Sequence, residues 1–233
     1  MRGVLWDRYE RLFKPGQTVL DIGCGTGIDA VYLAWIGICV IGIDASPTMI
    51  AEARAKVSDW FNDRIVFRVM DATDIGSLPE RSVDGIISAF ASLNTVDDVA
   101  GFGAAAARLL IPGGTMLLHL LNRWSLWEWM GLIRTGRFDE ARRLGRNQER
   151  NFNISGRPVQ HRLYHAGDAY TRCFAAHFRL RRAYGLGILR PPHTVQRIPA
   201  AIVNELQQVE PMVRARRPFR DWGRFFVLEL ERR

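Results

Sequence analysis

Cysteine and lysine are scarce in this sequence, and no hydrophobic run is long. The three cysteines, Cys24, Cys39 and Cys173, are odd in number and have no paired spacing, which argues against a disulfide framework or a zinc site. The longest apolar run, residues 30–43, falls short of the roughly 20 residues that a membrane span needs. The first residues also lack the apolar core of a secretory signal. These absences predict a cytoplasmic protein with no metal site and no membrane partner.

Because lysine is rare, arginine supplies nearly all the positive charge, and it is concentrated in the second half. Residues 1–120 carry 10 basic and 14 acidic side chains, whereas residues 121–233 carry 22 arginines and 10 acidic side chains. Such a basic surface can attract nucleic acid, membrane lipid or an anionic substrate. The only lysines are Lys14 and Lys56, so a general preference for arginine, with solvated helix faces, is the simpler interpretation.

Short apolar segments alternate with segments of helical spacing along the first half. This alternation predicts a parallel sheet covered by helices on both faces and joined by right-handed crossovers. The predicted strands are Thr18–Asp21, Cys39–Ile43, Ile65–Val69, Gly85–Ser88 and Thr115–Leu121. The predicted helices are Val4–Phe13, Ile28–Ile36, Pro47–Val57 and Val99–Leu110. Ser46 is the expected N-cap of the third helix, because proline follows it at the first helical position.

The second half is more irregular, although it contains no internal repeat. Residues 123–144, rich in tryptophan and arginine, predict helices at the edge of a cleft, and the polar residues 147–158 predict a loop. Two final strands, Phe178–Ile188 and Arg224–Glu229, are expected on either side of a helix around Ile202–Val209. We therefore expect a single domain over 1–233, with a cofactor-binding core at 1–121, an insertion at 122–175, and strands in 176–233 that complete the sheet.

The loop after the first predicted strand has glycine at alternate positions, Gly23, Gly25 and Gly27, and follows Asp21. Glycine lets the backbone turn sharply and lets a ligand lie against the main chain at the carboxyl end of the sheet. A dinucleotide-binding fold would instead have Gly-x-Gly-x-x-Gly. The observed spacing therefore argues against a nicotinamide cofactor.

Further motifs follow in order. Asp44 ends the second strand and Asp71 ends the third, Ser82–Ser88 contains the fourth strand, and Leu109–Gly114 forms the turn before the fifth. Together with the glycine loop, they resemble the class I S-adenosylmethionine-dependent methyltransferases over residues 18–121. The resemblance implies an α/β, Rossmann-like, doubly wound and mostly parallel seven-stranded sheet with an antiparallel last strand. It also implies S-adenosyl-L-methionine as cofactor, with S-adenosyl-L-homocysteine as the product.

The resemblance also assigns roles around the cofactor. Asp21 and the backbone at 23–25 would bind the methionyl end, Asp44 the ribose hydroxyls and Asp71 the adenine amino group. Asp44 and Asp71 could instead be solvated strand-end carboxylates or helix caps. The expected cofactor-binding residues are Asp21, Gly23, Cys24, Gly25, Asp44, Ala45, Met49, Asp71, Ala72 and Ser88.

Within that set, Cys24 is expected to be a small loop residue rather than a nucleophile, because its position in the motif faces the cofactor. Met49 would pack on adenine, unless it has an ordinary core role.

Four segments, residues 88–94, 123–129, 164–165 and 185–193, resemble a subgroup of small-molecule methyltransferases whose substrates are mostly unassigned. Side chains predicted either to shape an acceptor pocket or simply to pack are Phe90, Asn94, Trp124, Trp127 and Tyr164.

Methyl transfer is an in-line displacement that chiefly needs alignment, and a base is required only if the acceptor must lose a proton. Candidate bases are His165, His193 and Glu128. Each histidine could instead be an ordinary surface or core-edge residue, and Glu128 could simply pair with an arginine.

The sequence thus predicts an S-adenosylmethionine-dependent methyltransferase that acts on oxygen or nitrogen of a small-molecule acceptor, as a monomer or a homodimer. An RNA or DNA methyltransferase is a second hypothesis. However, base-modifying amino methyltransferases usually carry Asn/Asp-Pro-Pro-aromatic where this chain has Ser88-Ala89-Phe90-Ala91. A protein that binds S-adenosylmethionine without catalysis is a third hypothesis, and an NAD-dependent oxidoreductase, against the glycine spacing, is a fourth.

Overall fold

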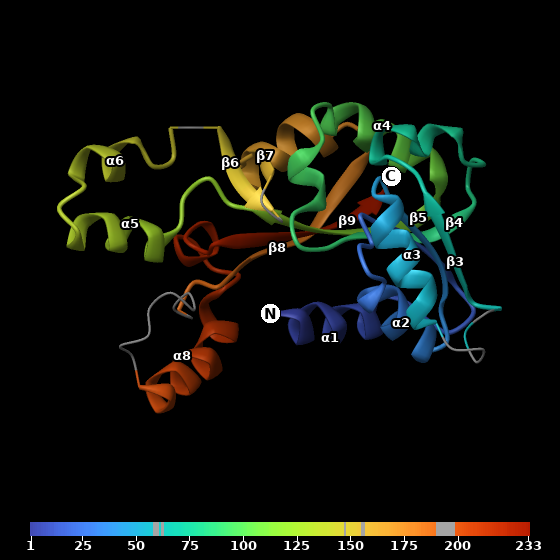
Figure 1. Ribbon diagram of the computed structural model, residues 1–233, viewed down its shortest axis with the longest axis horizontal. Helices are drawn as coiled ribbons and strands as arrows, with labels where there is room; N and C mark the ends of the chain where they lie inside the picture. The colour runs from blue at the N-terminus through green and yellow to red at the C-terminus, as the bar shows by residue number, and fades with distance from the viewer. Residues whose placement is uncertain (58–60, 62, 147, 155–156, 190–198) are drawn as a thin grey trace.

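The computed structural model describes residues 1–57, 61, 63–146, 148–154, 157–189 and 199–233. A mixed seven-stranded sheet runs through it in the order β3-β2-β1-β4-β5-β9-β8 (Figure 1). The strands are β1 (Thr18–Ile22), β2 (Cys39–Asp44), β3 (Ile65–Val69), β4 (Val83–Ser88), β5 (Leu110–Leu121), β8 (Phe178–Leu186) and β9 (Phe225–Arg232).

Strands β1 to β5 pair in parallel, and β9 is antiparallel to both of its neighbours, β5 and β8. The predicted seven-stranded sheet with an antiparallel last strand is therefore confirmed. Most of the segment Leu109–Gly114, the turn predicted before the fifth strand, falls inside β5 as a break in the ladder, because Val83 pairs with Leu110 and Gly85 pairs with Thr115. All five parallel strands end at one edge of the sheet, and their carboxyl ends bring the motif residues together.

Each face of the sheet has its own apolar core. On one face, buried side chains of the sheet pack with those of α1 (Arg2–Leu12), α2 (Ile28–Trp35) and α3 (Pro47–Lys56). On the other face they pack with α4 (Val99–Leu109), α7 (Ala166–Ala169), and the short helices η2 (Ala72–Ser77) and η4 (Tyr170–Phe174). Helices thus cover both faces, as the alternating pattern predicts.

The N-terminus of α3 forms for the reason expected from the sequence. The Ser46 hydroxyl accepts a hydrogen bond from the Met49 N–H at 3.4 Å, and Pro47 occupies the first helical position. This cap satisfies one of the free N–H groups of the first turn. It also fixes where the chain leaves the carboxyl end of β2.

The predicted helices between 123 and 144 are confirmed as α5 (Leu126–Arg134) and α6 (Phe138–Arg143). The helix predicted around Ile202–Val209 is confirmed as α8 (Ala200–Val213), which precedes β9. Helices α5 and α6 lie beyond the sheet, at the opposite end of the molecule from α3 (Figure 1). Among the described residues, no helix combines the length and the hydrophobicity that crossing a bilayer requires.

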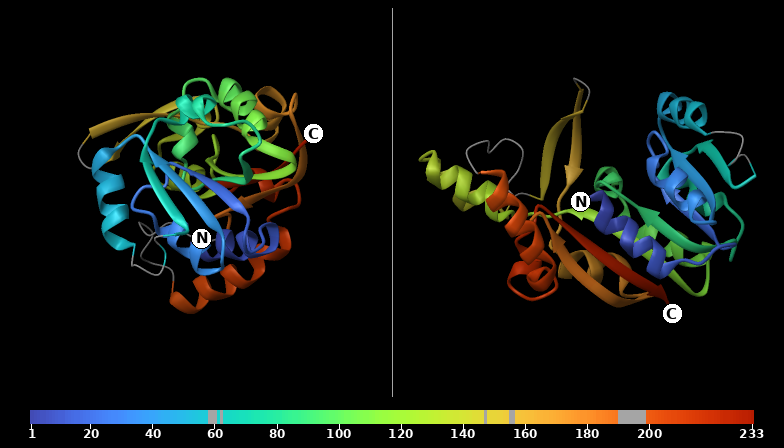
Figure 2. Two further views of the ribbon diagram at one scale, coloured as in Figure 1. Left: turned by 90° about the vertical axis from the view of Figure 1, so that its right-hand side faces the viewer. Right: turned by 90° about the horizontal axis from the view of Figure 1, so that it is seen from below.

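The prediction of a loop at 147–158 is wrong for the residues described there. Strands β6 (Glu149–Ile154) and β7 (Arg157–Arg162) form an antiparallel hairpin, which projects away from the main sheet (Figure 2). A ribbon that stands outside the sheet needs few apolar residues, so its sequence has the polarity of a loop. Cross-strand contacts stabilise it instead, including the edge-on rings of Phe152 and His161, whose centroids lie 5.0 Å apart.

A buried ion pair joins the first helix to the last strand. The Arg8 guanidinium on α1 donates to both carboxylate oxygens of Glu229 on β9, at 2.7 and 2.6 Å. The side chains are only 12% and 3% exposed, so neither charge is well solvated. Removing one partner would leave the other buried and uncompensated, which is far more costly than the net contribution of the pair.

We expect Arg8→Met to lower the free energy of unfolding by about 3–5 kcal/mol, because Glu229 then remains buried without a cation. Urea denaturation measures the loss. The double variant Arg8→Met/Glu229→Leu should recover most of it. Arg11→Met, at an exposed position on the same helix, is the matched control and should change stability by less than about 0.5 kcal/mol. Equal effects of Arg8→Met and Arg11→Met would contradict the importance of the pair.

Candidate functional site

The glycine loop between β1 and α2 combines close packing with open space. Gly23 and Gly25 have φ values of 65° and 53°, which L-residues with side chains rarely adopt. A Cβ on Gly23 would lie 2.4 Å from the Cβ of Ser92, whereas one on Gly25 would meet no atom within 4 Å. Gly23 is therefore required by packing inside the protein. Gly25 presents bare backbone to a space that a ligand can enter.

Asp44, at the end of β2, holds this loop in place. Its carboxylate accepts hydrogen bonds from the N–H groups of Gly25, at 3.0 Å, and Ser46, at 2.8 Å. A backbone bond from Cys24 to Ile43, at 2.9 Å, adds a second connection. Each carboxylate oxygen retains accepting capacity, because it has more than one lone pair. Asp44 is half-buried and can therefore both organise the loop and accept bonds from a ligand.

Asp21, at the end of β1, is a buried carboxyl with an unused oxygen. It is 2% exposed, and its Oδ2 has no hydrogen-bond partner among the described residues. Burial, followed by repulsion from Asp29, raises the pKa of Asp21 well above its usual range, while Arg2 opposes that shift. An acid in this environment favours a cationic or hydrogen-donating ligand, which would compensate the buried charge.

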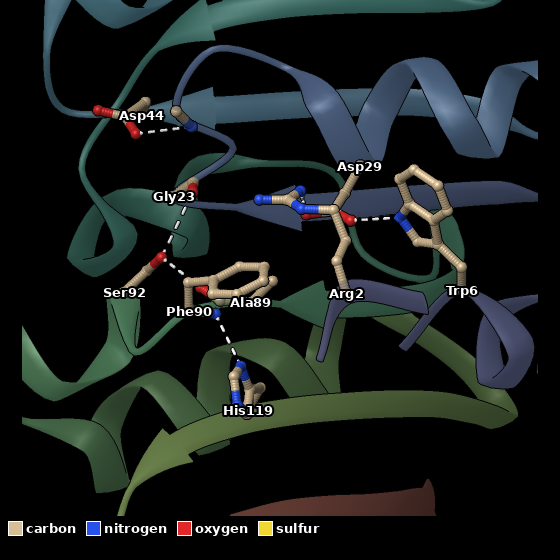
Figure 3. Close-up of polar contacts among 10 residues, drawn as sticks. Arg2, Trp6, Gly23, Asp29, Asp44, Ala89, Phe90, Ser92 and His119 are labelled. Atoms are coloured by element: carbon tan, nitrogen blue, oxygen red, sulfur yellow. Dashed lines mark hydrogen bonds and ion pairs between the residues drawn. The ribbon is translucent and has the colours of Figure 1, made fainter. Parts of the chain in front are cut away.

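Arg2 on α1 brings a positive charge close to Asp21 and Asp29. The Arg2 guanidinium bonds Asp29 at 2.5 Å and lies over the Phe90 ring, 4.3 Å from its centroid. The Trp6 indole N–H donates to the other oxygen of Asp29 at 2.8 Å, as Figure 3 shows. This cluster is not among the residues expected from the sequence. Arg2 and Trp6 lie four residues apart on one helix face, but no sequence pattern indicates that this face meets Asp29.

His119 on β5 is a second feature that the sequence does not predict. Its Nδ1 accepts the N–H of Phe90 at 3.0 Å, and its carbonyl accepts the N–H of Ala91 at 3.0 Å (Figure 3). Phe90 and Ala91 have φ values of 52° and 70°, an uncommon conformation that the surrounding structure must hold. His119 is fully buried, and burial lowers its pKa to about 3. The ring is therefore neutral at physiological pH, and its hydrogen is on Nε2.

The turn that His119 holds also contacts the glycine loop. The Ser92 hydroxyl, in η3 (Ser92–Thr95), lies 2.9 Å from the carbonyl of Ala89 and 3.3 Å from that of Gly23. Figure 3 shows this continuous series from His119 through the turn to Gly23. The end of β4 and the ligand-facing loop after β1 are thus positioned together.

The other predicted cofactor residues lie along the same sheet edge. The Met70 N–H donates to the carbonyl of Asp44 at 3.0 Å, which places the end of β3 beside the end of β2. Asp71 is exposed, and its Oδ1 accepts from the N–H and hydroxyl of Thr73, both at 2.8 Å, so it caps η2. A helix cap is one of the alternatives to adenine binding that the sequence leaves open for Asp71, and these two hydrogen bonds use only one carboxylate oxygen. Ala45 is exposed, Met49 and Ala72 are half-buried, and Ser88 is fully buried.

Cys24 has the environment of a packing residue. Its sulfur would lie 3.2 Å from a Cβ on Gly42, and burial raises the pKa of its thiol. A thiol with a raised pKa contains little of the nucleophilic thiolate. This agrees with the expectation of a small loop residue.

The predicted acceptor residues occupy different environments. Asn94 is 1% exposed, and its amide group donates to the carbonyl of Arg162 at 2.6 Å and accepts from the N–H of Leu121 at 2.9 Å. Its side chain therefore joins η3, β5 and β7, which favours a packing role. Phe90, by contrast, is 40% exposed beside the glycine loop.

Trp124, Trp127 and Tyr164 lie where the chain leaves β5. The Trp124 ring centroid is 6.0 Å from that of Trp222, and the indole nitrogen of Trp127 is buried. Tyr164 bridges to Asn122 directly after β5, and burial raises the pKa of Tyr164 to about 12. These three aromatic residues remain predicted pocket residues.

The candidate bases also differ. Glu128 accepts a hydrogen bond from Arg150 at 2.5 Å, so it forms an ion pair with an arginine. His165 is half-buried at the start of α7, and burial, followed by repulsion from Arg123, lowers its pKa. His193 lies outside the described residues. In the part of the chain that the structure describes, no group of three His, Cys, Asp or Glu residues could hold a metal ion.

The chain is similar to several known proteins. The family model described as a methyltransferase domain matches residues 20–118. A demethylmenaquinone methyltransferase from Tropheryma whipplei (strain Twist) is 38% identical over 103 residues, which are 44% of this chain and 41% of that protein. A ubiquinone biosynthesis O-methyltransferase from Xanthomonas campestris pv. campestris (strain B100) is 34% identical over 113 residues, 48% of this chain and 46% of that protein.

The chain thus spans about half the length of the curated relatives it matches. A solved S-adenosylmethionine dependent methyltransferase from Mesorhizobium loti is similar across 97% of both chains, with a TM-score of 0.64 and 18% sequence identity. At that identity the similarity shows a common fold. The segment that matches the family model contains the glycine loop, Asp21 and Asp44. His119 lies just beyond that segment, and Arg2 and Trp6 lie before it.

We expect Asp21→Asn to stabilise the free protein at neutral pH by about 1–3 kcal/mol, because it removes an ionisable group from a buried position next to another acid, Asp29. The raised pKa means that the folded state keeps the proton of Asp21 at a pH where the unfolded state has lost it. Stability therefore falls as pH rises from the ordinary carboxyl pKa through the raised one. Urea unfolding at several pH values across that range measures this dependence. The free energy of unfolding should change less with pH in Asp21→Asn than in the wild type. Asp74→Asn, at an exposed position, should show the wild-type dependence on pH.

For His119 we expect the free energy of unfolding to depend on pH in the opposite direction, with stability lost in acid. The unfolded state binds a proton below about pH 6.5, whereas the folded state resists protonation until about pH 3, so stability falls as pH decreases through that interval. The slope from this residue approaches about 1.4 kcal/mol per pH unit. His119→Asn keeps an acceptor for the Phe90 N–H and should reduce the slope in urea unfolding between pH 6.5 and 4. An unchanged slope would show that His119 is not buried in its neutral form.

Proposed function

We propose that this chain, whose residues 20–118 match the methyltransferase-domain model, transfers a methyl group from S-adenosyl-L-methionine to a small-molecule acceptor. One observation carries the proposal. Open glycine backbone at Gly25 lies between an unsatisfied buried carboxyl, Asp21, and a carboxylate with accepting capacity, Asp44. These are the groups that a ligand with a cationic end and a ribose would use.

The electrostatics support a cationic donor. Three acids, Asp21, Asp29 and Asp44, lie around the loop. Burial and the other two acids raise the pKa of Asp21, and the positive charge of Arg2 lowers it against these effects. S-adenosyl-L-methionine supplies an electrophilic methyl group on a sulfonium, and it also has an ammonium group. Asp21 would accept the hydrogen bonds of that ammonium and become ionised as it does so. Asp44 would accept from the ribose hydroxyls while it still holds the loop.

Within this scheme the protein's own groups act mainly by alignment. Methyl transfer requires the acceptor atom about 3–3.5 Å from the methyl carbon, along the line of the bond that breaks. Phe90 forms a wall beside the loop, and His119 and Arg2 fix that wall from two sides. A rigid aromatic wall excludes water and orients a flat acceptor.

We further propose that the acceptor is an aromatic, quinone-type molecule that is methylated on oxygen. One named relative is a demethylmenaquinone methyltransferase and another is a ubiquinone biosynthesis O-methyltransferase. Trp124, Trp127 and Tyr164 provide aromatic surface after β5. If a phenol must be deprotonated, His165 is the described candidate best suited to it. Its lowered pKa keeps the imidazole in the neutral form that can accept a proton.

The whole chain would work as one unit in the cytoplasm. Residues 1–121 would bind the donor, residues 122–175 would contribute to the acceptor side, and residues 176–233 would complete the sheet. Binding without catalysis and action on nucleic acid are the competing functions that the following experiments separate.

Isothermal titration calorimetry with S-adenosyl-L-homocysteine tests the donor site. We expect Asp44→Ala to weaken binding by about 1.5–3 kcal/mol, because a charged hydrogen-bond acceptor is lost. Asp139→Ala, at an exposed position on α6, is the control and should bind like the wild type. Absence of binding by the wild-type protein, or tighter binding of NAD, would contradict the proposed cofactor.

Release of S-adenosyl-L-homocysteine in the presence of S-adenosyl-L-methionine tests catalysis. A short-chain demethylmenaquinol and a catechol are suitable acceptors, and a mixed RNA sample covers action on nucleic acid. Turnover with the aromatic acceptors is expected. Binding of the donor with turnover on RNA alone would replace the proposed acceptor class, and binding with no turnover on any of the three would favour a non-catalytic protein.

A further inference from the structure

Helices α5 and α6 expose an apolar surface that the described part of the protein does not cover. No residue of α5 is buried, although most of its residues are apolar. Trp129 and Met130 are each 38% exposed, and Phe138 on α6 is 55% exposed. Leu126, Trp129, Met130 and Ile133 follow the i, i+3, i+4, i+7 spacing of one helix face. Monomeric proteins rarely expose apolar side chains in such groups without a binding partner.

Arginines accompany these apolar side chains. Arg134, Arg142, Arg143 and Arg146 are exposed, and none of them pairs with a carboxylate in the described part of the chain. By comparison, Arg137 bonds Glu140 and Arg150 bonds Glu128, at 2.5 Å each. The surface made by α5, α6 and Arg146 therefore combines exposed apolar groups with four arginines outside the described ion pairs, against one exposed acid on α6, Asp139, that is also outside them.

The sequence spacing places charge next to the apolar groups. Arg134 follows Met130 by four residues, and Arg142 follows Phe138 by four residues. Residues four apart lie on the same side of a helix, so each arginine is a neighbour of an exposed apolar side chain. Both helices lie beyond the sheet (Figures 1 and 2), so this surface can approach an extended partner.

We propose that the surface of α5, α6 and Arg146 docks on an anionic lipid bilayer. Tryptophan, methionine and phenylalanine can enter the boundary between headgroups and acyl chains, while neighbouring arginines contact lipid phosphates. Four unpaired arginines would repel a second copy of the same surface. A nucleic acid would satisfy the arginines but would leave Met130 and Ile133 without apolar contacts.

This inference goes beyond the proposed function and does not depend on it, because lipid binding needs neither donor nor acceptor. It revises the sequence-based expectation of no membrane partner. That expectation followed from the lack of a spanning segment, and an interfacial helix lies in the plane of the membrane rather than across it.

Vesicle co-sedimentation of the full chain is the direct test. We expect binding to vesicles of phosphatidylglycerol and phosphatidylcholine, and at least about tenfold weaker binding to pure phosphatidylcholine. Each arginine near an anionic surface contributes roughly fivefold to the partition coefficient. Arg142→Glu/Arg143→Glu should therefore reduce binding by at least about 25-fold. Trp129→Ala should reduce it by about tenfold through the loss of apolar contact.

Two further variants make the test specific. Arg134→Glu/Arg146→Glu changes the same surface outside α6 and should also weaken binding, which guards against a local folding defect in that short helix. Arg68→Glu/Arg172→Glu makes the same change in net charge at exposed positions on β3 and η4 and should bind within about fivefold of the wild type. Equal losses in both charge-reversed surfaces would overturn the proposal, because net charge alone would then explain the binding.

The remaining partner classes are outcomes of the same experiment. Analytical ultracentrifugation would reveal self-association, and loss of a dimer on Trp129→Ala would assign the surface to a second copy. Stronger binding to RNA than to anionic vesicles, weakened by Arg142→Glu/Arg143→Glu, would assign it to nucleic acid. Either result, or no binding to anionic vesicles at low salt, would reject lipid docking.

Discussion

The hydrogen bond between the Gly25 N–H and the Asp44 carboxylate is the contact around which the site is arranged. It joins the loop after β1 to the end of β2, at 3.0 Å, while the second carboxylate oxygen holds the N–H of Ser46, which caps α3. One side chain therefore sets the loop, the strand end and the following helix relative to one another. Because β1 is also paired with β4, the same geometry extends to the turn at Phe90.

Two buried titratable groups at the site lower the stability of the folded state. Asp21 is an acid whose charged form is disfavoured by burial, and His119 is a base kept neutral by burial. Neither group has all its polar atoms satisfied among the described residues. A core designed only for stability would replace both with apolar residues. Their presence near the carboxyl ends of parallel strands is expected where function takes precedence over stability.

The fold could be predicted from the sequence because its signals are local. Each strand or helix, the glycine loop and the Ser46 cap can be identified from a short stretch of neighbouring residues. The contacts of Arg2 with Asp29 and of His119 with Phe90 span 27 and 29 residues, and no pattern in either segment specifies its partner. The positive φ values of Phe90 and Ala91 are also unexpected, since most residues that adopt them are glycine. The hairpin at 149–162 could not be predicted from hydrophobic patterning, because the covered positions of its strands include the polar side chains of Arg150 and His161 beside Phe152.

The position of β9 has a consequence for synthesis on the ribosome. This strand lies between β5 and β8 in the sheet, although it is the last of the three to be made. Until it emerges, β5 presents a free edge and β8 has no strand to join. More than a hundred residues separate the paired segments of β5 and β9, so completing the sheet requires a long-range closure after β8 has been made. Nascent chains of this protein would therefore depend on protection of the β5 edge until the last strand inserts.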